Sequence, residues 1–175
     1  QVYGLLSTDR GLRLAFRKLD TIRDDILWWD DPAQPAQMLA EGHAVMASGF
    51  NGRFFDVARR GAVPVDIAWD GRIIGTVVWA IPATTETAGL ARRFLVHALQ
   101  PAIMARFSER IPYGPARKSA FERIGLNPET GIPMRVHLPN APQHGGRALV
   151  RDAAWYANTR ALRQRRFQSW LDQEE

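Results

Sequence analysis

The chain has 175 residues, of which 46% are hydrophobic and 23% are charged, and its formal net charge at pH 7 is +5. This length and apolar content suit one ordinary folded domain and exclude a largely disordered chain. The sequence contains no cysteine, which excludes disulfides, thiolate metal sites and cysteine nucleophiles.

The first forty residues are predicted to form one long helix, a loop and a short helix. Apolar residues recur at intervals of three or four positions at Leu12, Phe16, Leu19, Ile22 and Ile26. This spacing predicts an amphipathic helix over residues 11–27, capped by Thr8 or Asp9. The following segment, WWDDPAQPAQ, has two prolines and an acidic pair, so we expect a loop there and then a short helix that ends at Glu41.

The run VMASGFNGRFFDVARRGAVPVDIAW, residues 45–69, places two turn signals between apolar segments. It predicts a strand over residues 44–48, a turn over 49–52, a helix over 53–60 and a second strand over 65–69. Asn51 is expected to cap the helix, and Gly61 is expected to end it. Such units build α/β sheets, which bind ligands where strands end and helices begin. Phe50 and Asn51 lie at that place and are candidate binding residues.

The second half of the chain is predicted to be mainly helical. Asp70-Gly71 favours a hairpin between the strand over residues 65–69 and a strand over residues 72–81. Helices are then expected over residues 86–100, over 101–110 with Pro101 as the first residue, over 116–124, and from 151 or 152 to 171. A tight turn is expected over residues 111–115 and a loop over residues 126–146.

Three classes of function can be compared from the residues alone. The four histidines are scattered, so no metal or other cofactor is expected. The sequence lacks a nucleophile elbow, a phosphate-binding loop and a dinucleotide fingerprint. An enzyme is therefore not predicted. The positive charge and six tryptophans leave a basic nucleic-acid-binding domain as an alternative. The densest basic cluster, residues 160–166, shares its helix with an apolar stripe, so a solvated helix face is favoured and no nucleic-acid partner is expected.

Three segments taken together resemble the solute-binding proteins of ABC importers, of the spermidine- and putrescine-binding type. They are the run over residues 45–69, the turn IPYGPARKSA over residues 111–120 and the tail RDAAWYANTRALRQRRFQSWL over residues 151–171. The resemblance covers the carboxyl-terminal half of that family only. It implies an α/β, periplasmic-binding-protein-like fold, mainly the second lobe with an orphaned piece of the first.

The resemblance also implies a division of the chain and a function. Residues 1–75 would belong to the second lobe, residues 76–125 to the first, and residues 126–175 would return to the second. The expected role is capture of putrescine, spermidine or a related organic cation in the periplasm and delivery to a membrane permease. An orphaned strand would favour a homo-oligomer or a complementing first lobe as partner; the alternative is a truncated receptor fragment that binds no ligand.

The resemblance points to aromatic residues of a binding cleft. Phe50 matches a family position that forms part of an aromatic wall, and Tyr113 matches one that contributes a phenol. Trp155 and Tyr156 lie near a family position that contacts the ligand. For each, a structural role is the alternative: burial in the core for Phe50 and Trp155, and a place beside a tight turn for Tyr113.

Charge at the expected cleft departs from the family pattern. Polyamine binders carry an aromatic residue and an acid where this sequence has Gly75 and Val77. Loss of that carboxylate removes a charge-assisted hydrogen bond, an interaction of about 1.5 to 3 kcal/mol. Asp30 and Asp31, in a loop near the cleft edge, are candidate replacements, with a solvated turn as the alternative.

Overall fold

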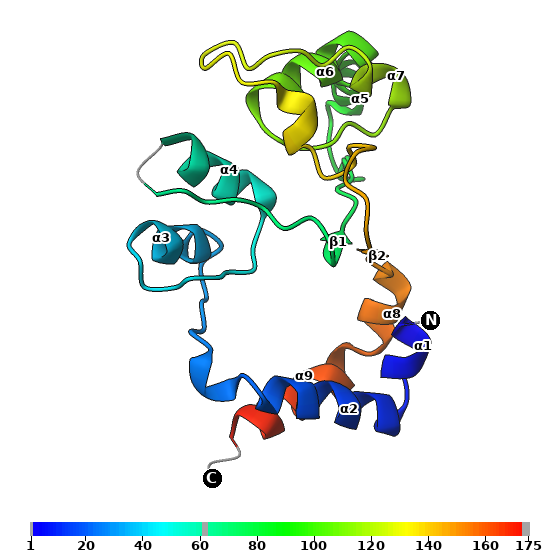
Figure 1. Ribbon diagram of the computed structural model, residues 1–175. Helices are drawn as coiled ribbons and strands as arrows, with labels where there is room; N and C mark the ends of the chain where they lie inside the picture. The colour runs from blue at the N-terminus through cyan, green and yellow to red at the C-terminus, as the bar shows by residue number, and fades with distance from the viewer. Residues whose placement is uncertain (1, 61–62, 173–175) are drawn as a thin grey trace. The chain divides into compact units, whose positions relative to one another are not determined.

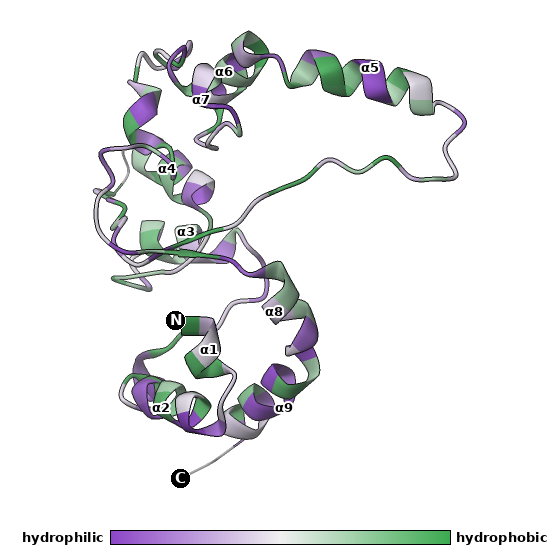
Figure 2. Cartoon of the chain, turned by 90° about the vertical axis from the view of Figure 1, so that its right-hand side faces the viewer, coloured by the Kyte–Doolittle hydropathy of each residue, from purple (hydrophilic) through white to green (hydrophobic). Residues whose placement is uncertain are grey.

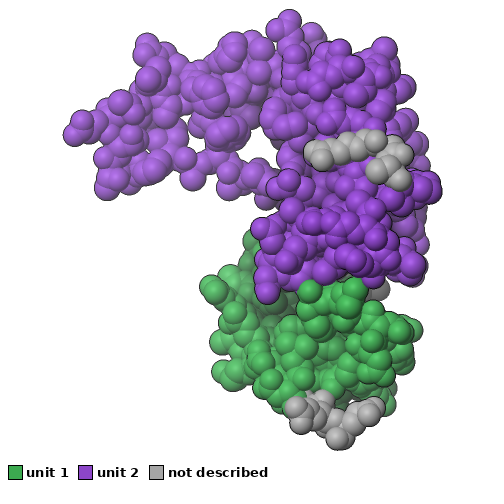
Figure 3. Space-filling view, turned by 90° about the vertical axis from the view of Figure 1, so that its left-hand side faces the viewer, with its two compact units in different colours: residues 1–28, 150–175 green, residues 29–149 purple. Residues whose placement is uncertain are grey.

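The computed structural model describes residues 2–60 and 63–172, so the predicted helix end at Gly61 lies outside the described residues. The chain divides into two compact units (Figure 3). One unit combines Gln1–Trp28 with Val150–Glu175, and the other is Trp29–Leu149.

The first unit is helical (Figure 1). It contains α1 (Val2–Leu6), α2 (Asp9–Asp20), the 3-10 turn η1 (Arg23–Asp25), α8 (Ala153–Asn158) and α9 (Arg160–Leu171). Thr8 caps α2 as predicted, because its side chain accepts a hydrogen bond of 3.0 Å from the Gly11 amide. Trp170 is buried; its ring stacks on Phe16 at 6.0 Å, and its indole N–H donates to Asp20 over 2.6 Å.

Two predicted helices of this unit are shorter than expected. The predicted helix over residues 11–27 ends at Asp20, where the Thr21 hydroxyl donates to the Lys18 carbonyl over 2.8 Å. The predicted helix to residue 171 divides into α8 and α9 at Thr159, whose hydroxyl bonds to the Trp155 carbonyl. In both cases a threonine hydroxyl donates to a backbone carbonyl of the preceding turn, at the position where the helix ends.

The second unit carries the remaining elements, with the last strand ending one residue beyond it. They are α3 (Gln34–Ala40), α4 (Asn51–Arg60), β1 (Arg72–Ile74), α5 (Ala88–Ala98), α6 (Pro101–Arg110), α7 (Lys118–Phe121), η2 (Met134–His137) and β2 (Ala148–Val150). Its core joins α4, α6, the end of α7 and η2, and consists of Phe55, Ala105, Ile124, Met134, Leu138 and Ala141. The predicted start of α6 at Pro101 is confirmed.

The predicted strands are the main error of the sequence analysis. Residues 44–48 are irregular and expose Val45 fully, residues 65–69 form no strand, and the strand predicted over residues 72–81 is only β1. The predicted hairpin is also wrong, because β1 pairs with β2. A strand needs a neighbour for its backbone groups, and an apolar sequence does not supply one.

The predicted turn at Asp70-Gly71 is present, but it is held by the chain before β2. Gly71 has a φ of +80°, and its amide donates to the Arg147 carbonyl over 2.8 Å. The Arg147 amide and guanidinium both donate to the Asp70 carboxylate, over 2.5 and 3.1 Å. These hydrogen bonds, the backbone one first, hold the pKa of Asp70 below its ordinary value.

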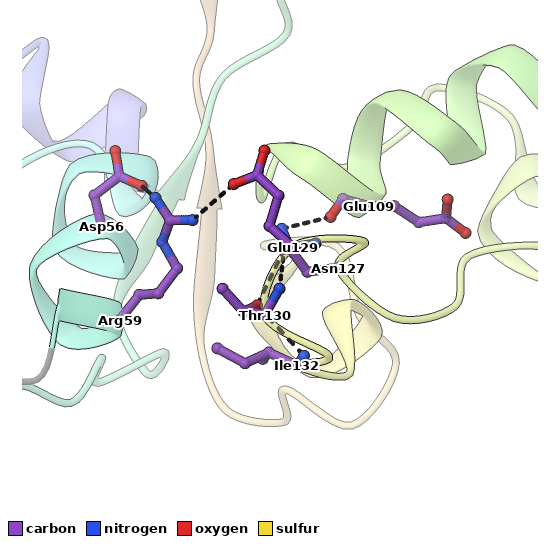
Figure 4. A network of polar contacts seen from close by, with 7 residues as sticks. All are labelled: Asp56, Arg59, Glu109, Asn127, Glu129, Thr130 and Ile132. Carbon is purple, nitrogen blue, oxygen red and sulfur yellow. Dashed lines mark hydrogen bonds and ion pairs between the residues drawn. The ribbon is translucent and has the colours of Figure 1, made fainter.

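The loop after α7 is organised by one buried amide (Figure 4). The Asn127 side-chain oxygen accepts three hydrogen bonds of 3.0 Å, from the Glu129 amide and from the Thr130 amide and hydroxyl. Its nitrogen donates to the Glu109 carbonyl at the end of α6 over 2.9 Å. Arg59 of α4 reaches the same loop through an ion pair of 3.5 Å with Glu129. The loop is thereby fixed to two helices.

Across the described ranges, no helix is both long enough and apolar enough to cross a membrane.

Candidate functional site

The N-terminus of α4 and the segment over residues 111–115 meet in the second unit. Asn51 is the first residue of α4, and its side-chain nitrogen donates a hydrogen bond of 2.6 Å to the Pro112 carbonyl. The predicted cap position is wrong, because Asn51 lies inside α4 as its first residue, and its side-chain nitrogen holds the neighbouring segment. The Asn51 oxygen keeps acceptor capacity.

Tyr113 lies directly against the first turn of α4. A Cβ atom placed on Gly52 would lie 3.3 Å from Tyr113 Cε1 and 3.4 Å from its hydroxyl oxygen. Gly52 is buried, so the absent side chain allows the phenol ring to approach the helix backbone. The first amide N–H groups of a helix have no partner within the helix, and the Tyr113 hydroxyl lies beside this end.

Side chains that the sequence analysis did not select hold Tyr113 in place. Ser108 of α6 is 1% exposed and donates to the Tyr113 carbonyl over 2.8 Å. Asn140 donates to the Pro115 carbonyl over 3.2 Å and lies against Gly114, where a Cβ atom would be 2.1 Å from the Asn140 oxygen. The sequence signal for this close approach was the glycine between Tyr113 and Pro115.

The structure thus brings Phe50, Asn51 and Tyr113 together at one end of α4. The side chains of Phe50 and Tyr113 are 58% and 46% exposed, so neither ring is buried in the core. Exposed aromatic faces bind methylene groups and cations. The hydroxyl and the amide groups of the helix end can donate hydrogen bonds to an anion.

Asp30 and Asp31 belong to the turn that precedes α3. The Asp31 carboxylate accepts a hydrogen bond of 2.7 Å from the Ala33 amide. The backbone amides of both acids donate to the side chain of Gln34, over 2.9 and 3.1 Å. The contacts of these two residues are therefore those of a turn.

Trp155 and Tyr156 belong to the first unit, whereas Phe50, Asn51 and Tyr113 belong to the second. Trp155 packs on Tyr3 at 5.0 Å and donates to the Ser7 hydroxyl over 2.8 Å. The Arg163 guanidinium lies 5.2 Å from the Trp155 ring and 4.6 Å from the Tyr156 ring. A cation of the protein itself thus occupies one face of each ring.

An apolar groove lies elsewhere in the second unit. Its walls include Phe55, Ile67, Trp69, Ile132, Val136 and His137. His144 stacks on Trp69 with ring centroids 4.1 Å apart. Burial lowers the pKa of His144, and the Arg72 guanidinium lowers it further. Burial also lowers the pKa of His137, with His144 as the second cause. No group of three potential metal ligands gathers within the described part of the chain.

Three comparisons with known proteins agree. A sequence model of a family described as bacterial extracellular solute-binding protein matches residues 2–134. The gamma-aminobutyric acid-binding protein of Pseudomonas aeruginosa is 36% identical over 169 residues, which cover 97% of this chain and 46% of that protein. The solved Atu4243-GABA receptor matches with a TM-score of 0.66 and 21% identity, over 99% of this chain and 54% of that chain. The chain spans about half the length of each of these proteins.

These matches confirm the predicted α/β fold of the periplasmic-binding-protein type. The family match supports the prediction of a solute-binding protein over an enzyme or a nucleic-acid-binding domain. The description of the family as extracellular agrees with a location outside the cytoplasm.

Proposed function

Because this chain belongs to the family of bacterial extracellular solute-binding proteins, we propose that it forms part of a periplasmic receptor for a small aliphatic amine. The receptor would deliver its ligand to the membrane permease of an ABC importer. The observation that carries the proposal is the 36% identity to a gamma-aminobutyric acid-binding protein over 97% of this chain.

Two candidate ligands, gamma-aminobutyrate and putrescine, each contain a chain of four carbon atoms. Gamma-aminobutyrate carries an ammonium group at one end and a carboxylate at the other, whereas putrescine carries two ammonium groups. A second ammonium needs a carboxylate partner. This chain has Gly75 and Val77 where the polyamine-binding type has an aromatic residue and an acid. We therefore favour gamma-aminobutyrate or a similar zwitterion, with putrescine or spermidine as the competing candidates.

The geometry around α4 supports a zwitterionic ligand. Phe50 and Tyr113 would contact the methylene stem with their exposed rings. The Tyr113 hydroxyl and the first amides of α4 would donate to the ligand carboxylate. The Asn51 oxygen would accept from the ammonium group, because the Asn51 nitrogen already donates to Pro112.

The other predicted site residues have weaker support for a role in binding. Asp31 accepts a hydrogen bond within its own turn, and Trp155 and Tyr156 face Arg163. Their assignment as ligand-binding residues stays a prediction, as does the assignment of residues 76–125 to a first lobe.

A receptor of this family closes two lobes around its ligand, and closure is stabilised by contacts with both lobes. The chain spans about half the length of the relatives it matches. We therefore expect the 175-residue chain alone to bind weakly and in fast exchange. Submicromolar affinity would contradict this expectation.

An NMR titration of the amide signals tests the proposal. Gamma-aminobutyrate should shift the signals of Asn51, Gly52 and Tyr113, and putrescine should shift them less. Tyr113→Phe removes one hydroxyl donor and should weaken gamma-aminobutyrate binding by about threefold to tenfold, without the same effect on putrescine. Tyr3→Phe, which removes a hydroxyl from the first unit, is the matched control. Unshifted signals at α4 with both ligands would refute the proposed site.

A further inference from the structure

The first residue of β1, Arg72, holds a segment that is distant in the sequence. Its guanidinium donates four hydrogen bonds of 3.0 to 3.3 Å, to the backbone carbonyls of Trp69, Pro139, His144 and Gly145. One of these acceptors lies in the turn before β1, and the other three lie in the segment over residues 139–145. The guanidinium therefore ties this segment to the turn.

This arrangement depends on the shape of arginine as well as on its charge. A guanidinium is planar and presents its five N–H donors as a fixed fork. A lysine ammonium has three donors on one nitrogen atom, so it cannot reach the same set of carbonyls at once. An exchange of Arg72 for lysine would keep the charge and remove the fork.

Arg72 orients one peptide group of the segment that it holds. The Pro139 carbonyl, which accepts from Arg72 Nε over 3.1 Å, belongs to the planar peptide group that joins Pro139 to Asn140. The side chains on either side, Leu138 and Ala141, are 0% and 3% exposed, so the core holds both ends of this short piece. Between these anchors, the direction of the Asn140 side chain depends on how the peptide group is turned.

Asn140 in turn contacts the segment that carries Tyr113. Its side-chain nitrogen donates to the Pro115 carbonyl over 3.2 Å, and a Cβ atom on Gly114 would lie 2.1 Å from its side-chain oxygen. Tyr113 directly precedes Gly114, and its ring lies against Gly52 at the beginning of α4. One hydrogen bond on each side of Asn140 thus connects the guanidinium with the candidate site.

We propose that Arg72 is a positioning residue of the candidate site, which sets the place of the Tyr113 phenol through Asn140 and thereby the strength of ligand binding. The proposal rests on the proposed function, because gamma-aminobutyrate is the ligand named there. Loss of the fork would free the peptide group after Pro139 to turn. The Asn140 side chain would then leave Pro115 and Gly114, and Tyr113 would lose part of its support.

Arg72→Lys tests this proposal in the protein without ligand and with it. In the free protein, the amide signals of Tyr113 and Gly114 should shift. In a titration, the affinity for gamma-aminobutyrate should fall by about threefold to tenfold, as expected for one weakened hydrogen bond. Arg92→Lys is the matched control, since it makes the same exchange at an exposed residue of α5, a helix with hydrophilic residues among hydrophobic ones (Figure 2).

Asn140→Ala tests the same link from its other end and leaves the fork of Arg72 in place. It should weaken binding about as much as Arg72→Lys does. The double variant should lose little more than either single variant, because both changes act through one contact. A purely structural role for Arg72 would give independent losses that multiply in the double variant, and this result would overturn the proposal.

The signals of the free protein separate this proposal from the proposed function. With Asn140→Ala already present, Arg72→Lys should leave the Tyr113 and Gly114 signals in place. Unchanged signals in Arg72→Lys alone, or equal shifts with and without Asn140→Ala, would overturn the positioning role. A wild type that does not respond to gamma-aminobutyrate would overturn the proposed function, and the free-protein signals would still decide whether Arg72 positions Tyr113.

Discussion

The side-chain amide of Asn51 donates a hydrogen bond of 2.6 Å to the backbone carbonyl of Pro112, which lies 61 positions further along the chain. This bond joins the beginning of α4 to the segment that carries Tyr113. It brings the two candidate aromatic residues, Phe50 and Tyr113, to one place. The candidate site depends on it, because the segment over residues 111–115, which carries Tyr113, has no regular structure of its own.

Asn51→Ala should lower the free energy of unfolding by about 1 kcal/mol, the usual contribution of one hydrogen bond. Asn51→Asp should cost more, because a carboxylate oxygen would face the Pro112 carbonyl. Urea denaturation of the wild type and the variants measures both effects. Asn158→Ala, which removes an exposed amide from α8, is the control. Equal stability of Asn51→Ala and the wild type would show that the bond contributes nothing.

Gly114→Ala should destabilise the protein by about 1 to 3 kcal/mol, as overpacking generally does. The added methyl group would lie 2.1 Å from the Asn140 oxygen and would displace the side chain that bonds to Pro115. Adding Asn140→Ala should relieve the clash, so the double variant should lose less than the sum of the single changes. Gly89→Ala in α5, where the new methyl meets open space, should not destabilise. Additive effects at positions 114 and 140 would contradict this account.

Asn127→Ala should be the most destabilising of these changes, by about 3 kcal/mol, because four hydrogen bonds lose their partner in a buried place. Asn127→Asp keeps the three accepted bonds but sets a carboxylate oxygen against the Glu109 carbonyl. It should fold at neutral pH with lower stability and recover part of the loss on acidification. Thermal unfolding at several pH values measures this difference. A loss below about 0.5 kcal/mol for Asn127→Ala would contradict the network in Figure 4.

Acidification from pH 7 should reduce stability through the two histidines near Trp69. Burial lowers the pKa of His137 and of His144 in the folded protein. The unfolded chain therefore binds more protons than the folded one as the pH falls below the ordinary histidine value of about 6.5. Stability present above that pH is lost as the pH falls towards the lowered values. Unfolding free energies measured between pH 7 and pH 5 should show this slope.

His144→Gln should flatten that pH dependence, and the double variant with His137→Gln should flatten it further. The single variant also loses the stacking of an imidazole on Trp69, so its stability at pH 7 should be lower. The change in slope, rather than the stability at one pH, is the decisive measurement. An unchanged slope in the double variant would refute the role of the histidines.

Local signals in the sequence predicted much of the helical structure. Thr8 caps α2 and Pro101 begins α6, as predicted. The last helical segment was expected to begin at 151 or 152, and there Asp152 caps α8 by accepting from the Trp155 amide over 2.9 Å. These features depend on residues within one or two turns of the helix. The exact ends of the helices were not predicted, because they lie where the hydroxyls of Thr21 and Thr159 donate to nearby backbone carbonyls.

Local signals did not predict the pairing of the strands or the residues that hold the candidate site in place. β1 pairs with β2 about 75 positions away, although the Asp70-Gly71 turn favoured a hairpin with residues 65–69. Ser108 and Asn140, which position the Tyr113 segment, lie in different parts of the sequence and have no distinguishing pattern.

By itself, the sequence determined the amphipathic helices, the turn at Asp70-Gly71, and Phe50 and Asn51 as candidate residues, and its resemblance to the family added Tyr113. Periodicity and capping are properties of neighbouring residues, so they can be read along the chain. Only the tertiary structure decided that Asn51 bonds to Pro112, that β1 pairs with β2, and that residues 76–81 make no backbone–backbone hydrogen bond with the rest of the described chain. These features depend on which distant backbone groups meet, and the spacing of residues along the chain does not contain that information.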